Sequence, residues 1–561
     1  MRVPFVALLV TAVVAVLVIL PIGFLIFGML WSSAPGAEGH FTTANLFRAL
    51  TDLRSLFLLS NTLIFALGST AMTLFVATTL AWIVHRTDTP GRRVFDALPL
   101  LGLMFPSIIG DIAWIFLLSP RSGLINLGAM DALGLAQPPL NIFTMWGMIW
   151  SQGLSLTPVA YLLIAGAFAN MNPALEEAAT TSGAGKLQVM IRVTIPLLIP
   201  AILSTAALMF MIGIQSFETP AFIGLPGKVD VYMSSIYSSL IRTFPANYGL
   251  ATAQASVFLL LSVLSMTFYL RVTRKLRGFT VITGKAYKPR VIRLGRWRYV
   301  TCSAFLIYLL IGLVLPVVTV GLVSFVPFYT VTAGNPFARL TLDNYLVLLD
   351  PRVTPIFLNG ALTSLTLGVA TGLVSLAIAL VMGYLVVRST LRGRRLIEGL
   401  AMLPLSFPGI VFALALLWTF ILIPTRLAGT FWILLIGYVI IFLPFAMRAV
   451  TNALVQLHPE LEEAARVSGA RWGATFRLVV IPLMKTSLVN GFTFIFVQAY
   501  RQLGAAVLLV APGTMVLPVI ILGFWEEGQV TLLASAVVLY GGLLVLTIML
   551  GRIFFKARLT I

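Results

Sequence analysis

The chain has 561 residues, of which 59% are hydrophobic and only 10% are charged. Soluble domains carry about 25% charged residues, so this composition excludes a soluble globular protein and predicts an integral membrane protein. The formal charge of +19 is expected from basic cytoplasmic loops rather than from nucleic-acid binding, and no nucleic-acid partner is predicted. One cysteine and three histidines exclude a multi-thiolate site and leave little for an imidazole site, so no metal site is predicted.

Long apolar runs predict twelve transmembrane helices, six in each half of the chain. Each run can cross about 30 Å of hydrocarbon, and backbone groups in lipid must be hydrogen-bonded within the segment, which favours helices. The runs cover residues 4–31, 57–85, 97–119, 142–170, 197–217 and 250–271 in the first half, and 300–327, 357–387, 396–423, 429–450, 486–510 and 531–554 in the second. The first run is too long for the apolar region of a signal peptide, so we expect it to remain as a span.

Basic residues gather in alternate loops and predict the orientation of the chain. Arginines follow the second and eighth runs, and residues 271–298 hold ten basic residues and no acidic one. The positive-inside rule places these loops and both termini in the cytoplasm. The chain then divides into a first domain (1–272), a basic cytoplasmic linker (273–299) and a second domain (300–561). Contact with anionic lipid of the bilayer explains the charge of the linker, and a regulatory role is the alternative.

Two polar stretches, at residues 173–196 and 459–482, repeat one another at an offset of 286 residues. The first begins PALEEAATTSG and the second PELEEAARVSG. A further repeat, Gly-Arg-Arg followed by Phe-Pro, begins at Gly91 and recurs at Gly393, an offset of 302. Equivalent loops are six spans apart, an even number, so the halves are predicted to be parallel repeats related by an axis along the membrane normal. A pore or gate is expected at their interface.

Each polar stretch predicts a short helix, a turn and a segment that enters the membrane. Pro173 suits the first turn of the helix, with Asn172 as its N-cap. Gly183 permits a sharp turn, and Pro196 and Pro482 open the next spans, where a missing amide costs little. A membrane protein that repeats such an element on its cytoplasmic side is expected to present it to a paired partner.

The two stretches resemble the cytoplasmic loop with the Glu-Ala-Ala motif in permeases of binding-protein-dependent ABC importers. The family pattern is Glu-Ala-Ala, three residues, Gly, nine residues and Ile-x-Leu-Pro; here Val replaces Ile and Ile replaces Leu in both copies. The matching residues are Glu176, Glu177, Ala178, Ala179, Gly183 and Pro196, and Glu462, Glu463, Ala464, Ala465, Gly469 and Pro482. The resemblance covers essentially the whole chain. It implies an all-α integral membrane protein of about twelve helices, with the type I ABC importer permease fold.

The resemblance also implies partners. In the family the loop is a coupling helix that docks in a groove of a cytoplasmic ATPase subunit, where Glu177 and Glu463 would each pair with a basic residue. The chain has no Walker A pattern, so two copies of a separate ATPase would use ATP and Mg²⁺, while this chain would bind no cofactor and would not be an enzyme. A periplasmic or extracellular binding protein would dock on the outer loops, and the chain would lie in the bacterial cytoplasmic (inner) membrane. The alternative is that these glutamates only solvate a loop helix.

Polar residues in or beside the predicted spans are candidates for the translocation path or its gate. They are Asp111, Gln215 and Glu218 in the first half, and Gln498, Tyr500, Arg501 and Gln502 in the second. At the 302 offset Asp111 corresponds to Ala413, so the halves differ there. We expect Glu218 and Arg501 to pair between the halves or to line the gate, and a pair that serves only packing is the alternative.

The stretches at 216–240 and 500–529 resemble the fused permeases of the ferric-iron uptake group. That group is similar to permeases for thiamine, phosphonates and polyamines, so ferric iron is the first expectation and these substrates are the alternatives. Ferric iron favours oxygen ligands. The side chains that offer them are Glu218, Asp230, Tyr500, Glu526 and Glu527, although such residues are also ordinary in loops.

A secondary transporter driven by an ion gradient is the alternative from another class of protein. It would need acidic ion ligands within the spans, and Asp111 is the only acidic residue well inside one. A receptor or scaffold that transports nothing would leave the paired loops unexplained.

Overall fold

The computed structural model describes residues 5–171, 174–276, 291–329, 340–352 and 354–555, which form helices, turns and two isolated bridges. Within these residues nine helices are long and apolar enough to cross a membrane, and three further bent pairs of helices bring the number to twelve. The prediction of about twelve spans is confirmed on this count. The predicted N-cap at Asn172 and first-turn proline at Pro173 lie outside the described residues, as does most of the linker.

The two halves contain matching sets of helices. Those of the first half are α1 (Phe5–Met29), α2 (Ala44–Thr51), α3 (Leu53–Arg86), α4 (Arg92–Phe95), α5 (Ser107–Leu118), α6 (Leu124–Leu133), α7 (Met145–Asn170), α8 (Ala174–Thr181), α9 (Lys186–Val189), α10 (Ile195–Gln215), α11 (Tyr232–Tyr237) and α12 (Tyr248–Leu276). Those of the second half are α13 (Trp297–Leu309), α14 (Leu315–Ser324), α15 (Asp343–Leu349), α16 (Pro355–Arg388), α17 (Arg394–Met402), α18 (Gly409–Leu422), α19 (Phe431–Gln456), α20 (Pro459–Val467), α21 (Trp472–Thr475), α22 (Ile481–Leu483), α23 (Lys485–Tyr500), α24 (Ala506–Leu509), α25 (Leu517–Glu526) and α26 (Val530–Phe555). The repeat shows in the lengths, since α3 and α16 each have 34 residues and α7 and α19 each have 26.

Short segments of tighter or wider helix join these elements. Two 3₁₀ segments lie at Leu98–Met104 and Leu403–Ser406, and π segments lie at Met190–Thr194, Pro220–Gly224, Ser238–Arg242, Leu310–Val314 and Phe476–Val480. Two of the π segments, those within the polar stretches, are again 286 residues apart.

The third span of each half is broken where the sequence predicts one helix. The helices on either side of the break meet at 93° in the first half and at 108° in the second. The residue before a proline is extended at each break, Phe105 before Pro106 and Phe407 before Pro408. The proline ring clashes with a helical conformation of the preceding residue, which explains the position of both breaks.

The eleventh span is also shorter than predicted. The apolar run predicts a helix across 486–510, but α23 ends at Tyr500 and follows a 73° bend after Leu483. Residues 503–509 are buried and turn back into the short α24. An apolar run indicates burial and does not separate a lipid-spanning helix from a segment buried in protein, so the sequence extends this span too far.

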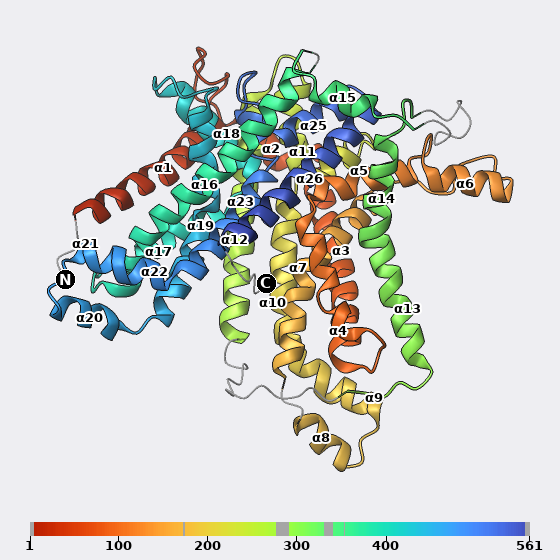
Figure 1. Ribbon diagram of the computed structural model, residues 1–561. Helices are drawn as coiled ribbons and strands as arrows, with labels where there is room; N and C mark the ends of the chain where they lie inside the picture. Colours follow the sequence, from red (N-terminus) through yellow and green to blue (C-terminus); the bar gives the residue numbers. More distant parts are fainter. Residues whose placement is uncertain (1–4, 172–173, 277–290, 330–339, 353, 556–561) are drawn as a thin grey trace.

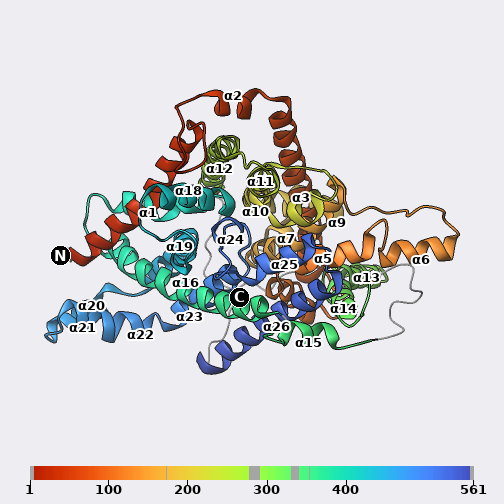
Figure 2. The same ribbon diagram turned by 90° about the horizontal axis from the view of Figure 1, so that it is seen from above.

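The first span of each half packs against the other half (Figures 1 and 2). α1 lies along α18 and α16, and α14 lies along α5. Gly28 of α1 is so close to the Trp418 ring that any side chain there would overlap it, and Phe27 contacts the same ring edge-on at 6.1 Å. This exchange of helices interlocks the two halves.

Candidate functional site

The two helices predicted from the repeated stretches, α8 and α20, lie apart at the periphery of the molecule, α8 at the bottom and α20 at the lower left of Figure 1. Each is followed by a glycine with positive φ, Gly183 at +87° and Gly469 at +85°. In each copy the next amide bonds back to the carbonyl five residues earlier, as in the 3.0 Å bond from Ala184 to Ala179. This is the helix-ending geometry that glycine favours, and the predicted turns are confirmed.

The paired glutamates of each helix face opposite ways. Glu176 and Glu462 are only 6% and 4% exposed, whereas Glu177 and Glu463 are exposed. The remaining motif residues are Ala178 and Ala464, which are exposed, Ala179 and Ala465, which are half-buried, and Pro196 and Pro482, which lie in the first turn of α10 and α22. Each motif therefore gives one carboxylate to the protein interior and one to the surface.

Glu176 is held inside the first half by two partners. Nη1 of Arg86, the last residue of α3, donates to its Oε2 at 3.3 Å, and the Thr194 hydroxyl donates to its Oε1 at 2.7 Å. The Arg86 side chain is 1% exposed, and its Nη2 lies 3.5 Å from the Phe168 carbonyl near the end of α7. The last carbonyls of a helix lack intrahelical donors, so the guanidinium joins α3, α7 and α8 at one point.

The second half repeats this junction with a different hydroxyl. Nε of Arg388, the last residue of α16, donates to Glu462 at 2.8 Å, and its Nη2 donates to the carbonyls of Leu454 (3.0 Å) and Leu457 (2.6 Å). The hydroxyl comes from Tyr384 of α16, 2.8 Å from Glu462.

Neither arginine belongs to the site residues predicted from the sequence. Arg86 and Arg388 nevertheless occupy equivalent positions at the 302 offset, each directly after an apolar run. A cation repeated at the buried end of a span is the signal that identifies this junction.

Asp111 lies in a buried cluster of polar side chains in the first half. It is 1% exposed and accepts a hydrogen bond from Ser151 of α7 at 2.6 Å. The Thr219 hydroxyl lies 3.0 Å from Asp111 and 2.9 Å from Gln152, which also accepts from Ser216 at 3.0 Å. A buried carboxylate is costly unless it is hydrogen-bonded, and here neutral hydroxyls supply the bonds.

Glu218 and Arg501 lie where the two halves meet. Glu218 is half-buried and accepts a hydrogen bond from Ser107. Within the described residues it forms no ion pair with Arg501, although the two charges are close enough to interact electrostatically. Nη1 of Arg501 instead approaches the Leu103 carbonyl of the first half at 3.4 Å.

Tyr500 and Gln502, two other predicted path residues, make packing contacts and hydrogen bonds within the second half. Tyr500 stacks on Tyr540 with ring centroids 4.9 Å apart, and each hydroxyl approaches the other residue's carbonyl, at 3.3 and 3.2 Å. The Gln502 carbonyl accepts a tyrosine hydroxyl from α19 at 2.9 Å. Gln215 and Gln498 are half-buried, and within the described part of the chain Nε2 of Gln215 is buried without a partner.

The polar cluster has no counterpart in the second half. Positions equivalent to Ser107, Asp111, Ser151, Glu218 and Thr219 hold Gly409, Ala413, Gly437, Gly504 and Ala505. A cavity of about 60 Å³ reaches the two serines that bond the carboxylates of the first half. The charged groups beside the interface therefore come mainly from one half.

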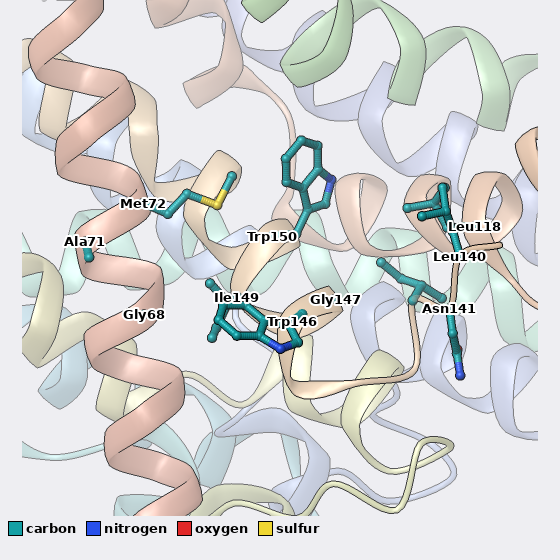
Figure 3. Close-up of a pocket in the computed structure, with 11 residues that line it drawn as sticks. Gly68, Ala71, Met72, Leu118, Leu140, Asn141, Trp146, Gly147, Ile149 and Trp150 are labelled. Carbon is teal, nitrogen blue, oxygen red and sulfur yellow. The ribbon is translucent and has the colours of Figure 1, made fainter.

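A larger cavity, of about 490 Å³, lies between α3 and α7 (Figure 3). Its lining is apolar apart from Asn141 and two indole rings, and one of these rings, Trp146, is 78% exposed. Such a lining suits hydrocarbon rather than an ion, so we do not assign it to the path.

A contact between the halves joins α11 and α25. The Tyr237 hydroxyl of α11 donates to Glu526 of α25 at 3.1 Å, and Arg242 pairs with the same carboxylate at 3.3 Å. Burial and the nearby carboxylate raise the pKa of Tyr237, so its hydroxyl remains a donor at neutral pH.

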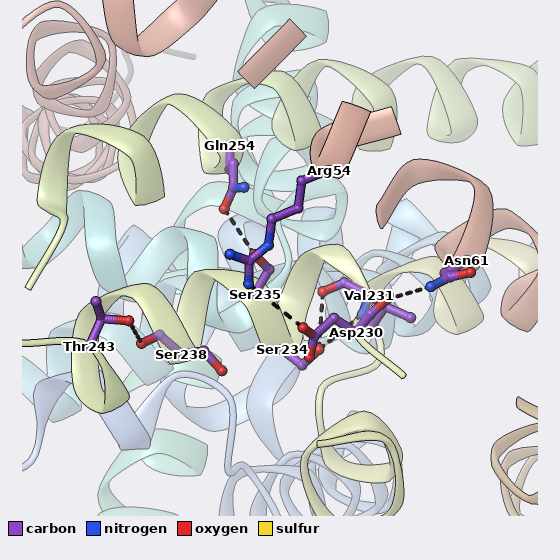
Figure 4. Close-up of polar contacts among 9 residues, drawn as sticks. All are labelled: Arg54, Asn61, Asp230, Val231, Ser234, Ser235, Ser238, Thr243 and Gln254. Carbon is purple, nitrogen blue, oxygen red and sulfur yellow. Dashed lines mark hydrogen bonds and ion pairs between the residues drawn. The ribbon is translucent and has the colours of Figure 1, made fainter. Parts of the chain in front are cut away.

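The N-terminal part of α3 contacts α11 and the residues before it (Figure 4). Asn61 donates to the Asp230 carbonyl at 3.0 Å, and Arg54 lies 3.8 Å from the Asp230 carboxylate. The Tyr232 amide donates to the Thr62 hydroxyl at 3.0 Å. One helix, α3, thus contacts α11 at one end and α8 at the other.

No resident metal site is assembled in the described part of the chain, where no three His, Cys, Asp or Glu side chains lie close enough together to hold an ion. Two of the predicted oxygen donors already have ionic partners, since Asp230 pairs with Arg54 and Glu526 with Arg242.

The interlocked helical repeats, each carrying the same short surface helix, form a protein with up to twelve membrane spans in its described residues. The family described as the inner membrane component of binding-protein-dependent transport systems matches residues 77–278 and 375–559. The chain belongs to this family and contains its domain twice. It is therefore a multi-pass permease of an ABC importer, as its resemblance to that group implies.

The similar proteins include permeases for several substrates. The ferric transport system permease protein FbpB of Actinobacillus pleuropneumoniae is 28% identical over 84% of this chain and 66% of its own length. The Fe(3+)-transport system permease protein FbpB 2 of Haemophilus influenzae is 21% identical over 84% of each chain. The trehalose transport system permease protein SugB of Mycobacterium tuberculosis is 28% identical over 46% of this chain and 94% of its own length.

Proposed function

We propose that this permease carries ferric iron from a periplasmic or extracellular binding protein into the cytoplasm, driven by two copies of a separate ATPase. The observation that carries the proposal is the pair of equivalent helices, α8 and α20, each anchored by a buried glutamate and presenting Glu177 or Glu463 outward. Both helices and both termini would then face the cytoplasm. Similarity of most of the chain to two iron permeases favours iron over thiamine, phosphonates and polyamines.

The polar groups where the halves meet are the proposed translocation path. Asp111 and Glu218 with their serine partners would offer oxygen atoms to a hard cation, and Arg501 would repel one until the path opens. Alanine at Glu218 or at Arg501 should lower uptake of labelled ferric iron without lowering the abundance of the chain in the membrane. Normal uptake in both variants would remove these residues from the path.

The ATPase contact is tested by reversing the exposed charges. The chain is purified with candidate ATPase subunits, as wild type and as the double variant Glu177→Lys with Glu463→Lys. We expect the double variant to lose the complex and the coupled ATP hydrolysis, whereas Glu398→Lys, an exposed change on α17, should retain both. An unchanged complex would contradict the assignment, and uptake that persists without any ATPase would favour an ion-driven transporter.

A further inference from the structure

The second span of each half ends at its coupling helix. Arg86 is the last residue of α3 and Arg388 the last residue of α16, and each donates to the buried glutamate of the motif. Within the described residues these are the ion pairs that join the second spans to the coupling helices. α8 has covalent connections only to α7 and α9, so the first pair adds a link to a helix 90 residues earlier in the chain.

The same two spans hold the outer helices through a matched hydrogen bond. The Thr62 hydroxyl of α3 accepts the amide of Tyr232 at the start of α11, at 3.0 Å. The Ser364 hydroxyl of α16 accepts the amide of Leu517 at the start of α25, at 2.8 Å. Each hydroxyl precedes the arginine of its helix by 24 residues, a length of about 36 Å along the helix axis.

The outer helices in turn meet between the halves. Glu526 of α25 accepts a hydrogen bond from Tyr237 of α11 and pairs with Arg242 in the π segment that follows it. A continuous set of contacts therefore runs from α8 through α3 to α11, across Glu526 to α25, and through α16 to α20. The same contacts occur in both halves although the hydroxyl partner of the buried glutamate differs.

We propose that α3 and α16 transmit movement of the coupling helices to the outer mouth, with Arg86 and Arg388 as the input positions and Thr62 and Ser364 as the output positions. This inference rests on the proposed function, because it needs an ATPase that moves α8 and α20. A helix bonded at both ends displaces both contacts when it moves as a rigid element. When the coupling helices move, α11 and α25 are pulled apart at Glu526 and the mouth opens.

The test measures the mouth directly in the whole transporter. The chain, its ATPase and its binding protein are reconstituted in vesicles, in a Cys302→Ser background. Spin labels are attached through Thr243→Cys and Gln529→Cys, beside the contact between α11 and α25. The distance between the labels is measured with and without ATP, together with ATP hydrolysis. The test variants are Arg86→Gln with Arg388→Gln, and Thr62→Val with Ser364→Ala. The matched controls are Arg93→Gln with Arg394→Gln, and Thr79→Val with Thr363→Val, whose hydroxyls bond carbonyls of their own helices.

We expect the ATP-dependent change in label distance to fall by at least half in both test variants. The Thr62→Val with Ser364→Ala variant, which leaves the anchors of α8 and α20 intact, should hydrolyse ATP within twofold of the wild-type rate. The control variants should keep the full change. A full change in the Thr62→Val and Ser364→Ala variant, whose substitutions are mild enough to preserve the fold, would overturn the proposal. If the wild-type chain binds no ATPase or its label distance ignores ATP, the proposed function itself fails; if the wild type and both test variants respond equally, only the transmission fails.

Discussion

The two halves of the chain share a buried arginine–glutamate junction and differ in the polar side chains beside their interface. Arg86 with Glu176 and Arg388 with Glu462 form the same buried pair at equivalent ends of α3 and α16. The hydrogen-bonded carboxylate at Asp111, by contrast, has no counterpart in the second half. The proposed function explains this difference: a junction that serves two copies of one ATPase would be needed in both halves, whereas a path between the halves could take its polar groups from one of them. Breaking each of these features in turn tests that distinction.

The largest effect on stability is expected when the buried carboxylate of Asp111 is copied into the second half. Ala413 is fully buried, and the positions that supply hydroxyls to Asp111 are Gly437 and Ala505 here. Ala413→Asp therefore buries a carboxylate without donors, which costs several kcal/mol. We expect the variant to be depleted from the membrane, as measured by its abundance and its melting in detergent. Adding Gly437→Ser and Ala505→Thr should restore part of the loss; a single variant as stable as the wild type would show that the halves do not differ at this position.

Breaking the buried ion pairs should cause the next largest loss of stability. The pair of Arg388 with Glu462 should contribute more than the pair of Arg86 with Glu176. Removing one partner of a buried pair costs roughly 3–5 kcal/mol. Arg388→Met should lower the melting temperature more than Arg86→Met, because Arg388 makes shorter bonds to Glu462 and to two carbonyls. The double variant Arg388→Met with Glu462→Met should recover much of the stability, since no charge is left unpaired. The reverse order of the two arginines would contradict this ranking.

The hydroxyls that complete the junctions should have smaller and similar effects. A hydrogen bond to a charged group contributes about 1.5–3 kcal/mol. Thr194→Val in the first half and Tyr384→Phe in the second each remove one such bond to the buried glutamate. Chemical denaturation of the two variants should give comparable losses, and a clear loss in only one of them would show that the two junctions are not equivalent in energy.

The outer contact should contribute least to stability. Arg242 and Glu526 are 43% and 29% exposed, and exposed ion pairs contribute about 0–1 kcal/mol. Glu526→Gln should therefore change the melting temperature little, and 0.5 M salt should reduce the remaining difference because it screens exposed charges. A large loss of stability would mean that the mouth is a structural element rather than a contact that opens easily.

The sequence predicts the spans, the repeat and the turns well because each depends on local chemistry. Apolar length locates the helices, and Gly183 and Gly469 have the positive φ that a sharp turn requires. The breaks in the third spans could have been predicted from the sequence, since Phe105 and Phe407 each precede a proline. The end of the eleventh span could not be predicted, because residues 503–509 are apolar and are buried by protein rather than by lipid.

The sequence also could not predict which of the two glutamates of each motif is buried and which is exposed. Glu176 and Glu177 are chemically identical, and the contacts of Glu176 with Arg86 and Thr194 decide which of them is buried. Hydrogen bonds between residues distant in the chain, such as Arg86 with Glu176, depend on packing that no local pattern contains. The repeat does indicate which arginines to consider, because Arg86 and Arg388 recur at equivalent positions at the end of an apolar run.

The packing of α1 against the second half determines when its contacts can form during biosynthesis. α1 packs on α18 and α16, and the Trp418 ring that contacts Gly28 is translated about 390 residues after it. At roughly 5–20 residues per second the ribosome needs about 20–80 s to reach it. During that interval α1 can pack on α12 of its own half but lacks α16 and α18, whereas α14 finds α5 already translated when it leaves the ribosome. The contacts of α1 with the other half thus form only late in translation.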